Sequence, residues 1–182
     1  MRKVTAGLFH ALDGVVEAPN QFQFDSFDAD LGGMLGAIMG RVDTVLMGRV
    51  GYQEWAGYWP QATADGDFAD FINGVPKFVA SDTLSGPLEW NNARLIEGDM
   101  LDFVRTLKAG PGGEISAMGG ISLVRQLLFA GLLDELTLIT HPVVAGSGRP
   151  LFEKGDPVTR LTLLGSQHTE KGNVVSTYGL RG

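Results

Sequence analysis

Hydrophobic and polar residues alternate along the chain in two patterns, which predict strands and helices in turn. Short apolar and β-branched runs predict strands at 4–9, 44–47, 77–80, 94–97, 114–118 and 136–140. Apolar residues at helical spacing predict helices at 29–39, 67–72, 100–107 and 121–130. Two alternating runs at 160–166 and 173–180, joined by 168–172, predict a hairpin. This order is typical of an α/β sheet with an antiparallel tail.

Length and composition predict one globular domain over residues 1–182. The chain is 44% hydrophobic and 19% charged, and it contains no repeat, low-complexity tract or linker. No secretory signal pattern follows the N-terminus, and no apolar run reaches the roughly 18 residues of a membrane-spanning helix. We therefore expect a cytoplasmic protein with no membrane partner.

The charged and metal-binding residues exclude several classes of function. The formal net charge is −7, which argues against a nucleic-acid partner bound through a general basic surface. Cysteine is absent, which excludes disulfides, thiol catalysis and cysteine-bound metals. The three histidines, His10, His141 and His168, lack metal-ligand spacing, so we expect no metal site and structural roles for all three.

Three segments share a layout of a strand, then glycine or small polar residues, then a helix. They are 45–49, 78–83 and 115–120. Ligands of α/β sheets bind beyond the carboxyl ends of strands, where unpaired N–H groups favour an anion and glycine lets a phosphate approach. Arg49 adds a charge for a phosphate. Each glycine turn alone is also explained as an ordinary turn, but the set predicts a nucleotide site.

The same segments resemble a known family when they are taken in order. The motifs are Met47–Tyr52, Lys77–Leu84, Ala117–Gly120, Leu132–Leu136 and His141–Gly148 with Leu151-Phe152, and Asp13-Gly14 matches as well. Together they resemble the C-terminal reductase domain of the RibD family over nearly the whole chain. The deaminase half and its cysteines are missing, so a stand-alone member is expected.

The resemblance implies a dihydrofolate reductase-like fold. This fold has three layers, with helices flanking a central mixed, mostly parallel sheet that ends in an antiparallel hairpin. The family binds NADPH, and its members usually pair, so the resemblance also implies NADPH as the cofactor and a homodimer.

Carried over residue by residue, the family's cofactor contacts fall on three groups of positions. The phosphates meet Gly48 and Arg49, and the pyrophosphate is held by Gly119 and Gly120, with the turn continued by Ile121 and Ser122. The adenosine 2′-phosphate pocket is lined by Ser81, Asp82 and Thr83. In dihydrofolate reductases the Gly-Gly peptide is cis, so a cis bond is expected between Gly119 and Gly120.

Two positions depart from the family pattern. Gly51 stands where the family places a threonine that donates a hydroxyl to phosphate, and Asp82 stands where relatives often have an arginine. A carboxylate at Asp82 would repel a 2′-phosphate unless it pointed away. NADPH remains the expected cofactor, but these two positions make use of NADH a stronger alternative here than in the rest of the family.

Candidate catalytic and substrate residues come from two regions. Asp13 and the cluster Asp25, Asp28 and Asp30 are candidate acids. Dihydrofolate reductases keep an acidic residue on the first helix, and Asp28 or Asp30 falls in that region. The alternative for both is a carboxylate that complements the helix dipole. Asp13 is expected as a turn residue beside the nicotinamide. The substrate pocket is assigned to Asp13, Trp55 and Trp59, although an aromatic cluster is also typical of a core.

The expected activity is NADPH-dependent reduction of a small-molecule substrate. The resemblance implies hydride transfer to a heterocycle or ribosylamino compound, as with 5-amino-6-(5-phosphoribosylamino)uracil in riboflavin biosynthesis. Two alternatives are a reductase of dihydrofolate or another pterin, and a non-catalytic nucleotide-binding dimer.

Overall fold

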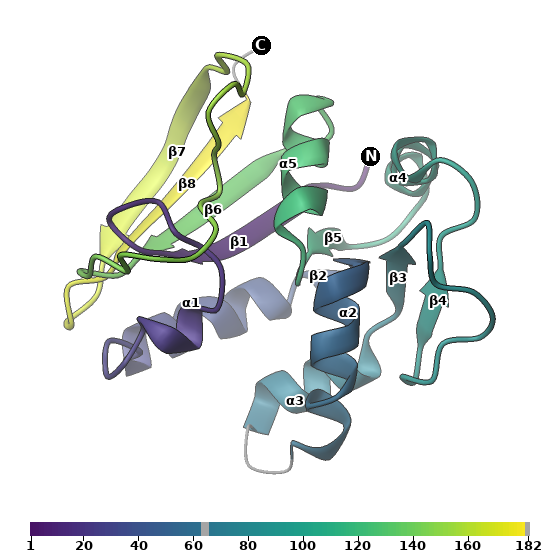
Figure 1. Ribbon diagram of the computed structural model, residues 1–182, viewed down its shortest axis with the longest axis horizontal. Helices are drawn as coiled ribbons and strands as arrows, with labels where there is room; N and C mark the ends of the chain where they lie inside the picture. The colour runs from purple at the N-terminus through teal and green to yellow at the C-terminus, as the bar shows by residue number, and fades with distance from the viewer. Residues whose placement is uncertain (63–65, 181–182) are drawn as a thin grey trace.

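A sheet of eight strands runs through the molecule, with helices on both faces (Figure 1). The computed structural model describes residues 1–62 and 66–180. The strands are β1 (Val4–His10), β2 (Val42–Gly48), β3 (Lys77–Ala80), β4 (Ala93–Leu95), β5 (Glu114–Ala117), β6 (Glu135–Thr140), β7 (Leu161–His168) and β8 (Val174–Leu180). Their order across the sheet is β4-β3-β2-β5-β1-β6-β8-β7.

The helices are α1 (Ala29–Met39), α2 (Arg49–Ala56), α3 (Gly66–Gly74), α4 (Met100–Ala109) and α5 (Ile121–Phe129), with short 3₁₀ turns at Pro19–Gln21 and Trp59–Gln61. Helices α1, α3, α4 and α5 lie where the sequence pattern predicts helices, whereas α2 was not among the predicted ranges. None of the helices in the described part of the chain has the length and apolar character needed to cross a bilayer.

Strand pairing confirms the predicted mixed sheet. β4, β3, β2, β5, β1 and β6 pair in parallel, which requires the chain to cross over between successive strands of this set. β8 pairs antiparallel with both β6 and β7, so the predicted C-terminal hairpin is confirmed. Since parallel neighbours end at the same edge, the carboxyl ends of β3, β2, β5 and β1 lie in a row.

One element of the predicted layout is wrong. The small polar residues after β3 do not open a helix, because the chain runs as a loop from Ser81 to the start of β4 at Ala93. The Ser81 hydroxyl oxygen accepts hydrogen bonds from the N–H groups of Thr83 (3.2 Å) and Leu84 (2.9 Å). A serine that holds its own chain in this way closes a turn instead of capping a helix.

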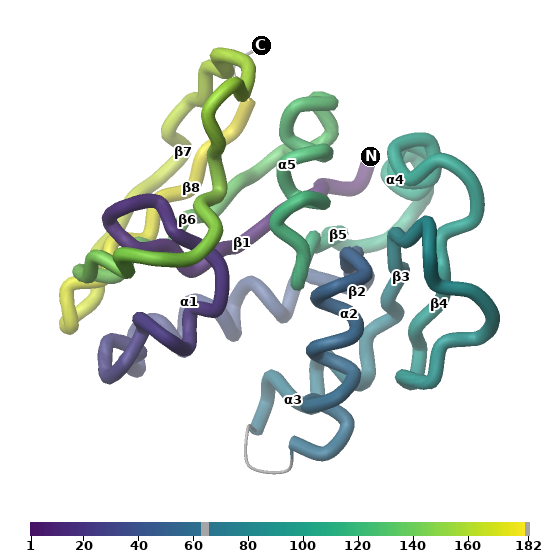
Figure 2. Tube along the Cα trace, in the orientation of Figure 1, coloured from purple at the N-terminus to yellow at the C-terminus, as the bar shows by residue number. Residues whose placement is uncertain are grey.

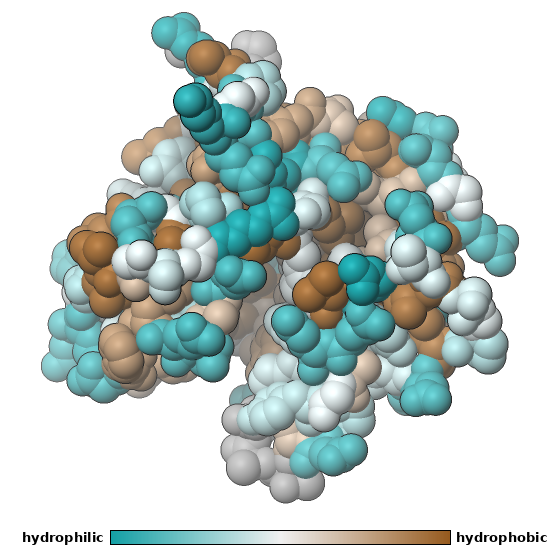
Figure 3. All heavy atoms as spheres, viewed as in Figure 1, coloured by the Kyte–Doolittle hydropathy of each residue, from teal (hydrophilic) through white to brown (hydrophobic). Residues whose placement is uncertain are grey.

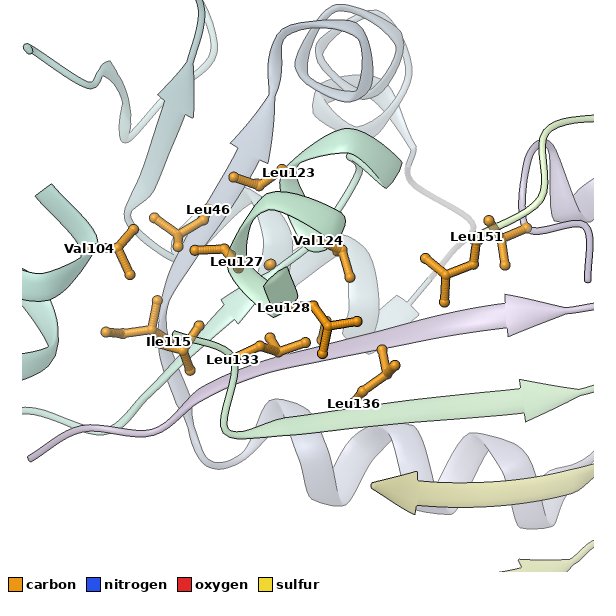
Figure 4. Close-up of a cluster of buried hydrophobic side chains, with 14 of the residues drawn as sticks. Leu46, Val104, Ile115, Leu123, Val124, Leu127, Leu128, Leu133, Leu136 and Leu151 are labelled. Atoms are coloured by element: carbon orange, nitrogen blue, oxygen red, sulfur yellow. The ribbon is translucent and has the colours of Figure 1, made fainter. Parts of the chain in front are cut away.

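The two largest hydrophobic clusters fill much of the space between the sheet and the helices on its faces. Successive residues of a strand point to opposite faces, so Leu46 packs in one cluster and its neighbours Val45 and Met47 in the other. Figure 4 shows the first cluster, in which Leu123 and Leu127 of α5 are buried against the sheet. These two layers of side chains give the three-layer arrangement.

Lys77 is buried beside the second of these clusters, which contains Ile72, Val75 and Trp90. Lys77 is only 1% exposed, and its Nζ donates to the carbonyl oxygens of Ile72 (2.8 Å) and Val75 (2.9 Å). The ammonium also lies 4.6 Å from the centroid of the Trp90 ring. Burial lowers the pKa of Lys77 to about 8, because removal from water disfavours the charged form.

The segment that follows β1 lies beside the segment that follows β6, which Figure 2 shows as neighbouring purple and green traces. Val16 N–H donates to the Arg149 carbonyl (3.0 Å), and Val15 forms a bridge with Pro150. A Cβ on Gly148 would lie 2.8 Å from the Val15 side chain, so glycine is needed at this contact. The two loops therefore form one connected surface at the carboxyl edge of the sheet.

Candidate functional site

Two helices begin side by side at the carboxyl edge of the sheet. β2 ends at Gly48 and α2 begins at Arg49, while β5 leads through Gly119 and Gly120 into α5. A Cβ on Gly48 would lie only 3.6 Å from the Gly120 Cα and 3.8 Å from the Gly119 carbonyl oxygen. The structure thus brings together the three glycines that the sequence assigned to phosphate binding.

These two helices differ from α1 and α4 in how they begin. Asp28 caps α1 and Asp99 caps α4, each accepting a hydrogen bond from a first-turn N–H group. Gly48 and Gly120 are the N-cap residues of α2 and α5, and neither helix has a hydrogen bond from a capping side chain. The first-turn N–H groups of a helix have no partner within it, and the helix dipole favours an anion there. Two adjacent uncapped ends suit a diphosphate.

The expected cis bond between Gly119 and Gly120 is wrong, since no peptide bond in the described part of the chain is cis. The chain turns at Gly119 instead, where φ is +64°. Glycine adopts this left-handed conformation without the steric penalty that a Cβ would bring.

Two arginines flank the paired helix ends. Arg49, the first residue of α2, is exposed, and its Nη1 lies 3.0 Å from the Gln53 Oε1. Arg149 was not among the sequence candidates. Its Nη1 donates to the Ser122 Oγ (3.0 Å) in the first turn of α5, and its Nε donates to Glu153 (2.9 Å). The only sequence signal for this contact was the position of Arg149 directly after Gly148, in the glycine-containing loop that follows β6.

The third predicted segment lies two strands from β5, at the end of β3. Ser81 is half-buried in its turn, whereas Asp82 and Thr83 are exposed. A cavity of about 590 Å³ opens beside Ser81, between the loop that contains Leu84 and Leu88 and the strand β4. Ser81 lines this cavity, and neither Asp82 nor Thr83 is among its lining residues.

Both carboxylates predicted as acids on the first helix hold the hairpin turn between β7 and β8. Asp28 accepts from the N–H groups of Leu31 (2.9 Å) and Lys171 (3.0 Å), and Asp30 accepts from that of Glu170 (3.2 Å). A hydrogen bond from the Thr169 hydroxyl, together with these N–H groups, lowers the pKa of Asp28. These contacts account for both residues as structural groups, and their role in proton transfer stays a prediction.

Asp13 connects the two loops described above. Its carboxylate accepts from the N–H groups of Gly146 (2.8 Å) and Ala145 (3.3 Å). The bond from Gly146 is the main reason why the pKa of Asp13 lies below its ordinary value. The predicted turn residue is therefore also the group that fixes the late loop.

The two predicted tryptophans lie in an aromatic cluster between α2 and α3. Trp59 contacts Phe68 at a centroid distance of 4.7 Å, and Trp55 contacts Trp59 at 6.0 Å. Both are half-buried and pack against the hydrophobic cluster on that face. The packing accounts for them as core residues, and their contact with a substrate stays a prediction.

A buried histidine lies at the end of β6. His141 is 0% exposed, with its Nδ1 2.6 Å from the Asn173 Oδ1 and 2.8 Å from the Ser26 Oγ. Its Nε2 lies 3.3 Å from the Gln23 Nε2. Burial lowers the pKa of His141, so the neutral ring is the favoured form. This network ties the segment before α1 to the hairpin.

The surface is hollowed between α2 and the segment that follows β1, on the side where α5 begins (Figure 3). The paired helix ends therefore face an open part of the molecule. This is the position at which α/β sheets bind their ligands, beyond the carboxyl ends of the strands.

Comparison with known proteins agrees with this geometry. The RibD C-terminal domain family matches residues 2–175. The uncharacterised protein YyaP of Bacillus subtilis strain 168 is 30% identical over 185 residues, covering 100% of this chain and 96% of its own.

Solved structures show the fold. A protein from Shewanella sp. PV-4, whose name assigns it to riboflavin biosynthesis, superposes with a TM-score of 0.75 at 21% identity, covering 99% of both chains. Dihydrofolate reductase from Enterococcus faecalis, complexed with NADP(H) and RAB-propyl, gives a TM-score of 0.66 at 12% identity, covering 99% of this chain and 97% of its own. The chain has the dihydrofolate reductase-like fold, and it belongs to the RibD C-terminal domain family.

Proposed function

We propose that this protein is an NADPH-dependent reductase of small heterocyclic or ribosylamino substrates. The observation that carries the proposal is the pair of uncapped helix ends at Gly48 and Gly120, which lie in contact beside Arg49. Membership of the RibD C-terminal domain family supports a reductase, and the similarity to an NADP(H)-bound dihydrofolate reductase supports the cofactor.

The residues present fit the diphosphate of such a cofactor. Gly48, Gly119 and Gly120 carry no side chain, so a phosphate can approach the backbone N–H groups of both helices. Arg49 and Arg149 stand at the two helix ends and supply positive charge on a chain whose net charge is −7. When bound, NADPH supplies the hydride, and the chain binds and orients the two reactants.

The substrate class is proposed from the family to which the chain belongs. A ribosylamino pyrimidine such as 5-amino-6-(5-phosphoribosylamino)uracil is the first candidate, supported by the name of the Shewanella relative. The opening of the molecule between α2 and the loop after β1 leaves room for such a heterocycle beside the cofactor (Figure 3).

A thermal-shift titration with NADPH and NADH tests cofactor binding first. A ligand at about 100 times its dissociation constant stabilises the native state by roughly 2.7 kcal/mol, which raises the melting temperature measurably. Oxidation of NADPH is then followed with the pyrimidine substrate and with dihydrofolate. Turnover of the pyrimidine supports the proposal. Turnover of dihydrofolate alone would mean that the substrate is a pterin and not a ribosylamino pyrimidine. If neither NADPH nor NADH binds, the proposal is overturned.

We also propose that the protein forms a homodimer through β7. This strand lies at the edge of the sheet and is exposed along almost its whole length, with Leu163 54% and Leu164 55% exposed. An exposed, partly apolar edge strand is suited to pairing with the same strand of a second copy. Leu163→Glu should shift the dimer toward monomer in sedimentation experiments, whereas Val158→Glu, outside the strand, should not. A wild-type monomer at micromolar concentration would contradict this assignment.

A further inference from the structure

The cavity beside Ser81, called here the β4 cavity, has a charge arrangement that the sequence candidates do not explain. Besides Ser81, Leu84 and Leu88, it is lined by Arg94 in the middle of β4 and by Glu97 beyond its end. It lies two strands from β2, which is about 10 Å at ordinary strand spacing. A nucleoside whose diphosphate is bound at Gly48 can span that distance.

Arg94 differs from most other arginines of the chain. Side-chain partners are present for six of them, as follows: Arg2 with Asp43, Arg41 with Glu114, Arg49 with Gln53, Arg105 with Asp102, Arg125 with Asp156, and Arg149 with Glu153. Within residues 1–62 and 66–180, Arg94 and Arg160 have no hydrogen bond or ion pair. Arg160 precedes β7 at the other end of the sheet. Arg94 is thus the unpaired guanidinium at the cofactor side.

The acidic residues near the β4 cavity do not neutralise Arg94. Asp82 is exposed and is not among the lining residues, so its carboxylate need not face a ligand in the cavity. Glu97 lines the cavity as well, but no ion pair joins it to Arg94 among the residues that the structure describes. The end of the cavity at Arg94 therefore remains suited to an anion.

We propose that Arg94 binds the 2′-phosphate of the adenosine of NADPH and so sets the preference for NADPH over NADH, an inference that rests on the proposed function. A guanidinium forms two parallel hydrogen bonds with a phosphomonoester. The Ser81 oxygen already accepts two N–H groups, which leaves its hydroxyl proton to donate to the same phosphate. Arg94 thus supplies the charge that relatives often place at the position of Asp82.

The test measures the contribution of the 2′-phosphate to the binding affinity separately from the rest of the nucleotide. Adenosine 2′,5′-bisphosphate and 5′-AMP differ only in that group, and their affinities are measured by calorimetry for the wild type and for Arg94→Gln. We expect the variant to lose about tenfold or more in affinity for the bisphosphate and nothing for 5′-AMP, as for a charge-assisted contact. Arg105→Gln, an exposed arginine paired with Asp102 on α4, is the matched control and should change neither affinity.

The outcomes separate this inference from the proposed function. If the wild type binds NADPH but Arg94→Gln still prefers the bisphosphate as strongly, Arg94 is not the determinant and the reductase proposal stands. If the wild type binds NADPH and NADH equally, the inference also fails. If it binds neither dinucleotide, the proposed function itself fails.

Asp82→Asn should leave the preference for the bisphosphate over 5′-AMP unchanged, and a tenfold gain in bisphosphate affinity would place the 2′-phosphate at Asp82 instead. Arg94→Lys, which keeps the charge, should lose less affinity than Arg94→Gln.

Discussion

Gly51 of α2 lies directly against Gly119 of the loop before α5, so closely that no side chain fits between them. A Cβ built on Gly51 would lie 1.6 Å from the Gly119 carbonyl oxygen and 2.7 Å from its Cα. Because the obstructing atoms are backbone, a rotamer change cannot relieve the overlap. The glycine that departs from the family's threonine is therefore required by the packing of this chain, and the hydroxyl is absent for a steric reason.

Restoring the family residue should damage the protein. We expect Gly51→Thr to lower the free energy of unfolding by about 1–3 kcal/mol or more, since it forces α2 away from Gly119. Cofactor affinity should fall as well, because the two helix ends separate. Denaturant unfolding and a thermal-shift titration with NADPH measure both effects.

Gly33→Ala is the matched control for this variant. Gly33 is also helical, but it is exposed and a Cβ there meets no atom within 4 Å. Alanine at an exposed helix position should raise the free energy of unfolding by about 0.5–1 kcal/mol. A Gly51→Thr protein that is as stable as the wild type and binds NADPH normally would show that the contact with Gly119 is wrong.

Arg49→Ala should weaken NADPH binding without affecting the fold. The side chain is exposed and has Gln53 as its partner, so little stability depends on it. Loss of one charge-assisted bond to a phosphate should cost about 1.5–3 kcal/mol, which is roughly 10- to 100-fold in the dissociation constant. Calorimetry measures the change against Arg105→Ala, and equal affinities in the two variants would remove Arg49 from the site.

His141 makes stability depend on pH below neutrality. Burial lowers its pKa in the folded state beneath the ordinary value of 6.5. The unfolded chain therefore takes up the proton first, so the stabilisation is complete above about pH 6.5 and is lost as the pH falls through the folded-state value. In His141→Gln the decline between pH 7 and 5 should be shallower, even if the variant is less stable throughout.

The control for that experiment is His168→Gln, because His168 is exposed at the end of β7. Its unfolding curves should keep the wild-type slope against pH. His10, whose pKa burial also lowers, contributes to the slope that remains in His141→Gln. An unchanged slope in His141→Gln would mean that the ring is not buried in neutral form.

Lys77 makes the free energy of unfolding depend on pH in the alkaline range. Its pKa is about 8 in the folded protein against 10.5 ordinarily, so between these values the unfolded chain binds more protons. The free energy of unfolding therefore rises with pH across this window because of Lys77. Lys77→Met should lack that rise, and Lys154→Met, at an exposed position, should keep it. Denaturant titrations at pH 8 and pH 10 distinguish them, and an identical rise in both variants would contradict the burial of a charged Lys77.

Local patterns predicted the parts of the fold that depend on neighbouring residues. Helix α1 runs over the predicted residues 29–39, since Leu31, Leu35 and Ile38 recur at helical spacing and Asp28 caps its start. The loop after β3 was misread, because a serine followed by aspartate and threonine suits a helix start and a turn equally well. Only the contacts of the Ser81 hydroxyl distinguish the two.

The site divides in the same way. Gly48 is the last residue of β2, and Gly119 and Gly120 lie just beyond the end of β5. Their meeting at one edge of the sheet could therefore be expected from the order of elements alone. Arg149 and Arg94 could not be expected. Arg149 donates a hydrogen bond to Ser122, which lies 27 positions away in the sequence. Arg94 is a candidate phosphate ligand because its guanidinium has no partner, and a sequence does not show which side chains are paired.

The first strand of the chain lies in the interior of the sheet, and this has a consequence for how the protein is made. β1 pairs with β5, which begins at Glu114, and with β6, which ends at Thr140. While the ribosome extends the chain, Val4–His10 has no neighbour until most of the protein has been synthesised. Strand β1 must stay without its sheet neighbours over that interval, so a chaperone that shields this segment should raise the yield of folded protein.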